Sequence, residues 1–149
     1  MNEKDKNEML EAILKENEAY QCKLWAVIMA GADTYALIGG LSTLTGGTAA
    51  ALGALSNAYC YLGVTEQHLN MVIVNSVNVS KIENRLSLPL SSITKAEVKG
   101  GILPGRKVVM LHFGKEKMKI SLMNNAIGSD IQGQKENVEM FCQIVSKLG

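Results

Sequence analysis

Hydrophobic and polar residues alternate with a period of two along much of the chain after residue 58, as in β-strands that bury one face. Between residues 82 and 90, for example, Leu86, Leu88 and Leu90 alternate with residues expected to face solvent. The apolar segments 59–64 and 69–75 flank a short polar segment and predict a β-hairpin. An aromatic and β-branched run before residue 30 adds one more strand, so the pattern predicts strands at residues 20–29, 59–64, 69–75, 82–90, 94–99, 107–113 and 117–123.

Helical periodicity occurs near both ends of the chain. Met9, Leu10, Ile13 and Leu14 fall on one face of a helix over residues 5–17. A helix of this length is marginal in water, so it needs a surface to pack against. We therefore interpret residues 1–19 as an N-terminal helix added to one domain over residues 20–149.

The C-terminal segment predicts a second helix. Val138, Phe141, Val145 and Leu148 recur at helical spacing, and residues 129–132 (Ser-Asp-Ile-Gln) have the form of a capping box. The predicted fold class is α+β and mainly β. We expect a bent, antiparallel, seven-stranded sheet or partly open barrel that is capped by the C-terminal helix.

Residues 31–58 form an insert rich in Gly, Ala and Leu, and no charged residue occurs between Asp33 and Glu66. Glycines recur there every seven residues, close to two helical turns, so a helix would carry a face of small residues that another backbone can approach. Three interpretations stay open: a helix or helical hairpin packed on the sheet or on a second subunit, a mobile loop, and an element that enters a membrane. The residues of this predicted assembly element are Leu37, Gly39, Leu41, Leu44, Gly46, Gly53 and Leu55.

Charge is segregated along the chain although the formal net charge is only +1. Residues 1–20 carry an acidic excess, whereas residues 81–119 hold nine basic residues against Glu83, Glu97 and Glu116. Because the basic residues lie on strands that should be adjacent, they predict a surface for anionic lipid headgroups or an acidic protein segment. The alternative is an ordinary solvated sheet face. The residues of this predicted surface, within 95–119, are Lys95, Lys99, Arg106, Lys107, Lys115, Lys117 and Lys119.

The order of elements resembles a pleckstrin-homology-like (PH-like) domain, and specifically its bacterial members. Residues 61–69 (Tyr-Leu-Gly-Val-Thr-Glu-Gln-His-Leu) are similar to a hairpin of the family, and residues 88–98 (Leu-Pro-Leu-Ser-Ser-Ile-Thr-Lys-Ala-Glu-Val) to one of its strands. The resemblance covers roughly residues 20–30 and 58–148, and it implies a binding scaffold. Phosphoinositide-binding members place several basic residues around the first hairpin, where this chain has only Lys23.

The residues that usually carry chemistry occur in this chain in patterns that predict none. His68 and His112 lie on different predicted hairpins without a metal-binding pattern, so we expect no metal and no cofactor. The three cysteines are interpreted as buried free thiols, and the glycine-rich segment 100–107 as a hairpin connection, because it leads into a strand and lacks phosphate-loop spacing. No exposed aromatic pattern accompanies the basic strands, so no nucleic-acid partner is expected. We predict that the protein is not an enzyme.

The sequence therefore favours a non-catalytic binding module of unknown ligand, which forms a homo-oligomer or binds another protein through the apolar insert. The alternative is peripheral association with an anionic membrane through the basic strands 95–119 and the insert 31–58. An acidic N-terminus is unlike the cationic start of a signal peptide, so we expect a cytoplasmic location.

Overall fold

All seven predicted strands form, and they make one antiparallel sheet. The structure is a computed structural model, and it describes residues 1–29, 57–126 and 128–148. The strand order across the sheet is β4-β3-β2-β1-β7-β6-β5, which confirms the predicted fold class. The elements are α1 (Glu3–Glu11), β1 (Cys22–Ile28), β2 (Ala58–Val64), β3 (His68–Val74), β4 (Ile82–Pro89), η1 (Leu90–Ser92), β5 (Lys95–Gly100), β6 (Arg106–Phe113), β7 (Glu116–Met123) and α3 (Gln134–Ser146).

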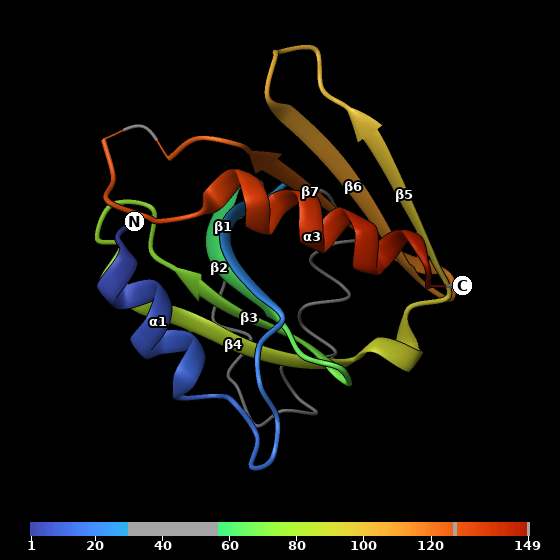
Figure 1. The fold of residues 1–149 in the computed structure, drawn as a ribbon, viewed down its shortest axis with the longest axis horizontal. Coiled ribbons are helices and arrows are strands. Elements are labelled where there is room, and N and C mark those ends of the chain that lie inside the picture. The colour runs from blue at the N-terminus through green and yellow to red at the C-terminus, as the bar shows by residue number, and fades with distance from the viewer. Residues whose placement is uncertain (30–56, 127, 149) are drawn as a thin grey trace.

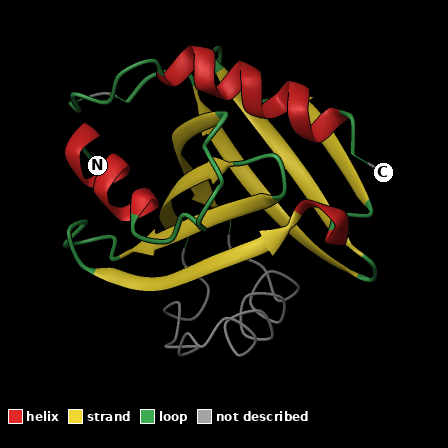
Figure 2. Ribbon diagram, turned by 60° about the horizontal axis from the view of Figure 1, so that its bottom comes forward, coloured by secondary structure: helices red, strands yellow, loops and turns green. Residues whose placement is uncertain are grey.

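The inner face of the sheet is the side that α3 covers (Figures 1 and 2), and the main core lies there. Leu24, Leu62 and Leu111 of three different strands are fully buried there. Phe141 of α3 is also fully buried in this cluster, together with Val138 and neighbouring helix residues. The helical spacing seen in the sequence therefore directs the apolar side of α3 onto the sheet.

The outer face of the sheet is partly covered by α1, an arrangement that the alternation does not predict. Leu10 of α1 is fully buried against Tyr61, Val72 and Val74. These three residues lie on β2 and β3, where nearly every residue is buried, whereas β4 and β7 keep much of the predicted alternation. The prediction that each strand buries one face and exposes the other is thus correct only outside the area that α1 covers.

The N-terminal helix is shorter than the predicted segment 5–17 and begins earlier. Asn2 is its N-cap, and the side-chain Oδ1 of Asn2 accepts a hydrogen bond of 2.8 Å from the Asp5 amide. The helix ends at Glu11, and the Tyr20 hydroxyl donates a hydrogen bond of 2.6 Å to the Leu10 carbonyl. A tertiary contact therefore takes up a carbonyl that a longer helix would have used.

The predicted capping box at residues 129–132 is wrong. Helix α3 begins at Gln134 after Gly133, which has a φ of 64° and provides no side-chain cap. Residues 129–132 bind the N-terminal segment instead: the Ser129 hydroxyl donates to the Met1 carbonyl at 2.8 Å, and Asp130 accepts from the Glu3 amide at 2.9 Å. The motif thus fixes the start of α1 on the sheet rather than the start of α3.

Gly63 is a position where the fold leaves no room for a side chain. A Cβ atom there would lie 2.5 Å from Cε1 of Tyr20, whose hydroxyl is held by Leu10 and Asn70. Gly63→Ala should therefore lower the free energy of unfolding by about 1–3 kcal/mol, because the Tyr20 ring must move. Urea denaturation measures the loss.

The matched control for Gly63→Ala is Gly100→Ala. A Cβ at Gly100 meets no heavy atom within 4 Å, so this variant should unfold within about 0.5 kcal/mol of the wild type. Equal stabilities for the two variants would show that the contact between Gly63 and Tyr20 does not constrain the fold.

Candidate functional site

Pairing across the sheet decides which face each basic residue of the segment 95–119 occupies, because paired residues point to the same side. Ser121 of β7 pairs with Val27 of β1 on the outer face, and Lys99 joins the same row through Val108. The period of two along each strand then places five basic residues on the outer face. We call this set the cationic face: Lys95, Lys99, Arg106, Lys117 and Lys119.

The other two residues of the predicted surface lie elsewhere. Lys107 pairs with the buried Leu122, so it belongs to the inner face, where it lines a cavity with Glu139 and Cys142 of α3. Lys115 lies in the turn between β6 and β7. The structure therefore brings together five of the seven, and adjacent residues such as Arg106 and Lys107 separate because a strand alternates its sides.

Glu97 places a carboxylate on the same side as the cationic face, and this carboxylate is already engaged. It accepts a hydrogen bond of 2.8 Å from Nε2 of His112 and lies 3.4 Å from the Lys95 ammonium. The hydrogen bond from His112, and next that from Lys95, hold the pKa of Glu97 below its usual value, so it stays ionised at neutral pH. Lys95 and His112 are thus the main partners of the Glu97 carboxylate.

The remaining cations of the face have no acidic partner among the residues that the structure describes. Lys99, Lys117 and Lys119 make no ion pair within this part of the chain. The Arg106 guanidinium is oriented by uncharged partners: Nε donates to the Ser121 hydroxyl at 2.8 Å, and a terminal nitrogen lies 3.9 Å from the Met29 sulfur. Such a surface attracts anions, because its positive charge is not balanced locally.

A groove of about 470 Å³ runs across part of the cationic face, beside the β5–β6 connection. It combines three cations with apolar walls, so it can hold a group that is anionic at one end and apolar at the other. Its lining residues include Lys99, Arg106 and Lys119 together with Met29, Ile102, Val108 and Met110; Glu97, Gly100 and Gly101 complete it.

Two apolar residues at this groove, one lining it and one next to it, are not singled out from the sequence. Ile102 is fully exposed and Leu103 is 56% exposed, both in the connection between β5 and β6. The sequence predicts this segment only as a hairpin connection, which the structure confirms. The sequence does contain a signal for these two residues: an Ile-Leu pair inside a glycine-containing turn is unusual, since turns usually carry polar residues.

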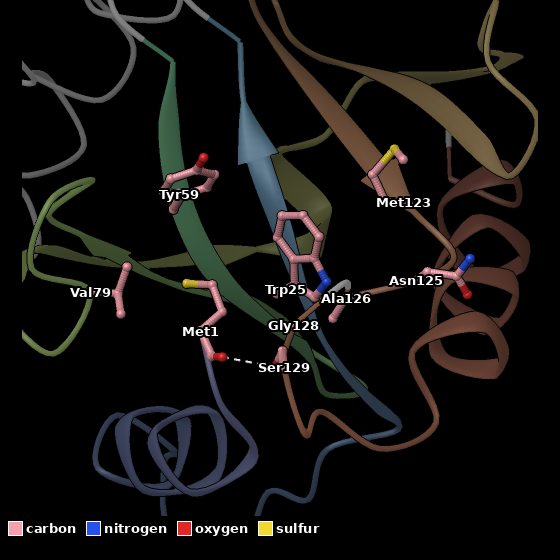
Figure 3. A pocket seen from close by; sticks show the side chains of 9 residues that line it. All are labelled: Met1, Trp25, Tyr59, Val79, Met123, Asn125, Ala126, Gly128 and Ser129. Carbon is pink, nitrogen blue, oxygen red and sulfur yellow. Dashed lines mark hydrogen bonds between the residues drawn. The ribbon is translucent and has the colours of Figure 1, made fainter.

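A second cavity, of about 360 Å³, lies on the outer face near the start of α1 (Figure 3). The rings of Trp25 and Tyr59 meet edge to face in it, with centroids 6.4 Å apart, and Met1 and Met123 are at its sides. None of its lining residues carries a charged side chain. The side chains that line this cavity are therefore apolar or uncharged, unlike those of the cationic face.

The cysteines and histidines occupy structural positions. Burial raises the pKa of Cys22 and of Cys60 to about 12, so neither is a thiolate at neutral pH. The Lys15 ammonium can only donate, so Nε2 of His68 accepts from it at 2.9 Å and Nδ1 donates to Glu18 at 2.8 Å. Within the described ranges no group of three or more His, Cys, Asp or Glu is placed to hold a metal ion.

The insert 31–58 falls almost wholly outside the described residues, which resume at position 57, and so does every residue of the predicted assembly element. Its seven residues (Leu37, Gly39, Leu41, Leu44, Gly46, Gly53 and Leu55) therefore stay a prediction. In the part of the chain that the structure does describe, no helix combines the length and the apolar character needed to cross a membrane.

Comparison with known proteins supports the fold. No protein-family model matches the chain, and no curated protein matches its sequence. Among solved structures it is similar to the hSac2 domain from the human phosphoinositide phosphatase Sac2, with a TM-score of 0.54 and 9% identity over 93% of this chain and 75% of that one. At this identity the likeness shows the fold alone, which is PH-like. The predicted bacterial origin stays a prediction.

Proposed function

We propose that this protein is a non-catalytic binding module that docks on anionic membrane surfaces through its cationic face. The observation that carries the proposal is the set of cations on one side of β5–β7, of which Lys99, Lys117 and Lys119 make no ion pair with described residues. Each basic residue near an anionic leaflet contributes about 1 kcal/mol to binding. Several acting together on one sheet face are sufficient for reversible attachment.

Two further observations support this function. One solved structure with a similar fold is a domain of a phosphatase named for phosphoinositides, which are anionic lipids, although the likeness itself concerns only the fold. The three cysteine thiols are also poor nucleophiles, since burial raises the pKa of each. Both observations support a module that binds a ligand without catalysing a reaction.

Co-sedimentation with vesicles tests the proposal. The intact chain is mixed with neutral phosphatidylcholine vesicles or with vesicles that also contain phosphatidylserine, each at low and at physiological ionic strength. We expect binding only to the anionic vesicles, and weaker binding at the higher ionic strength, where the screening length shrinks to about 8 Å. Equal binding to neutral vesicles, or no binding at either ionic strength, would contradict the proposal.

Self-association through the insert 31–58 is a separate proposal that the described residues do not bear on. It rests on the uncharged, glycine-patterned sequence, which a small sheet could not easily cover alone. Light scattering of the intact chain and of a variant lacking residues 36–55 tests it. We expect the deletion to lower the measured mass to that of a monomer, and an unchanged mass would refute self-association through the insert.

A further inference from the structure

The β5–β6 connection, residues 101–105, presents apolar side chains at a place where hairpin turns usually carry polar ones. We call this connection the hairpin tip. Ile102 is fully exposed there, Leu103 is more than half exposed, and the connection stands out from the body of the fold (Figure 1). Covering these side chains would be favourable, because apolar surface gains free energy when it leaves water.

The hairpin tip is a defined turn. The Gly101 amide donates to the Arg106 carbonyl at 2.7 Å, and the Arg106 amide donates to the Leu103 carbonyl at 3.2 Å. Gly105 has a φ of 76°, and its carbonyl accepts from the Asn124 amide at 2.8 Å, which ties the tip to the end of β7. Ile102 and Leu103 are therefore held outward by backbone hydrogen bonds.

Positive charge surrounds the base of the hairpin tip. Lys99 precedes it on β5, Arg106 follows it on β6, and both line the groove together with Lys119. Ile102 lines the same groove, so the apolar tip and the three cations belong to one continuous surface. An apolar projection bordered by cations matches an anionic bilayer, which is charged at its surface and apolar beneath it.

We propose that the hairpin tip inserts Ile102 and Leu103 into the interfacial region of an anionic bilayer, while the groove receives the phosphate of one phospholipid headgroup. This inference rests on the proposed function and adds to it the element that penetrates and the cations that hold the headgroup: Lys99, Arg106 and Lys119. Both acyl-region burial and charge pairing then contribute to binding, as stable peripheral attachment requires.

Charge favours a bilayer over a second copy of this chain as the occupant. A two-fold interface through the hairpin tip would bring the same patch of both copies together. The groove cations of one copy would then face those of the other, and like charges at short range repel. An anionic lipid surface meets the same patch with the opposite charge.

The decisive variant is Ile102→Ser with Leu103→Ser, measured on phosphatidylserine-containing vesicles over a series of salt concentrations. We expect its affinity to fall by about tenfold or more at every salt concentration, because partial burial of two apolar side chains is lost. The salt dependence should stay as in the wild type, because no charge is removed. The control is Val77→Ser: Val77 is 94% exposed in the β3–β4 connection, and its loss should leave the affinity unchanged.

The outcomes separate this inference from the function on which it rests. If the wild type binds anionic vesicles and the double variant binds equally well, the inference about the tip is overturned and the cationic face stands. If the wild type does not bind, both the inference and the proposed function are refuted.

A second measurement does not depend on a loss of binding. In Leu103→Trp, vesicles should shift the emission of the added tryptophan to the blue relative to the wild type, whose single Trp25 provides the background. An unchanged difference spectrum would also overturn the inference.

Discussion

Replacing Phe141 with alanine is expected to lower the free energy of unfolding by about 3–5 kcal/mol. Phe141 is among the largest side chains that are fully buried, and it connects α3 to the core on the inner face of the sheet. Truncation removes the apolar surface that the ring buries and leaves a cavity that the surrounding strands cannot fill completely. Urea denaturation followed by circular dichroism measures the loss.

The control for Phe141→Ala is the adjacent substitution Met140→Ala. Met140 is 43% exposed on the same turn of α3, so removing most of its side chain should change the stability by less than about 1 kcal/mol. Similar losses for both variants would show that α3 is not anchored through the Phe141 ring.

Gln134 is expected to give the second large effect, because its amide joins two strands where they no longer pair. Direct pairing of β1 with β7 includes Val27 with Ser121 and Ile28 with Ile120. Beyond it, the Gln134 Nε2 donates to the carbonyls of Trp25 at 3.0 Å and of Met123 at 2.9 Å. Its Oε1 accepts from the Trp25 amide at 3.2 Å. The side chain is thus a polar connection between α3, β1 and β7.

Gln134→Leu should lower the free energy of unfolding by about 2–4 kcal/mol, because it leaves backbone groups of both strands without partners in a buried place. Gln134→Glu should be at least as damaging at neutral pH, since a carboxylate would face two carbonyl oxygens. The same denaturation experiment compares them with Gln143→Leu, an identical change at an exposed position of α3. A loss at Gln134 no greater than at Gln143 would contradict this role.

The strands are predictable from sequence because their period of two is local. Met118, Ile120 and Leu122 alternate with charged or polar neighbours, and all three are buried as expected. The position of α1 is not predictable, since nothing local says which face of which strands a short amphipathic helix will cover. Tyr61 and Val72 are buried on the outer face, in the cluster that Leu10 of α1 completes.

The site is predictable in part for the same reason. The excess of basic residues between 81 and 119 indicates a charged surface, but sorting it into faces requires the register between strands. Alternation along β6 already separates Lys107 from Arg106, and the register gathers Lys95 and Lys117 on one row with His112. The apolar hairpin tip does carry a sequence signal, an Ile-Leu pair between Lys99 and Arg106. Only the structure shows that Ile102 lines one groove together with Lys119 of β7.

The most direct test of the central claim is vesicle binding by a variant in which two charges of the cationic face are reversed, Lys117→Glu with Lys119→Glu, at physiological ionic strength. Its control is Lys135→Glu with Lys147→Glu, which makes the same change of charge at exposed positions of α3 and just beyond its end. The account predicts that affinity for phosphatidylserine-containing vesicles falls by about 30-fold or more in the first variant, and clearly less in the second. Equal losses in both variants would show that binding follows net charge rather than this face, and would contradict the account.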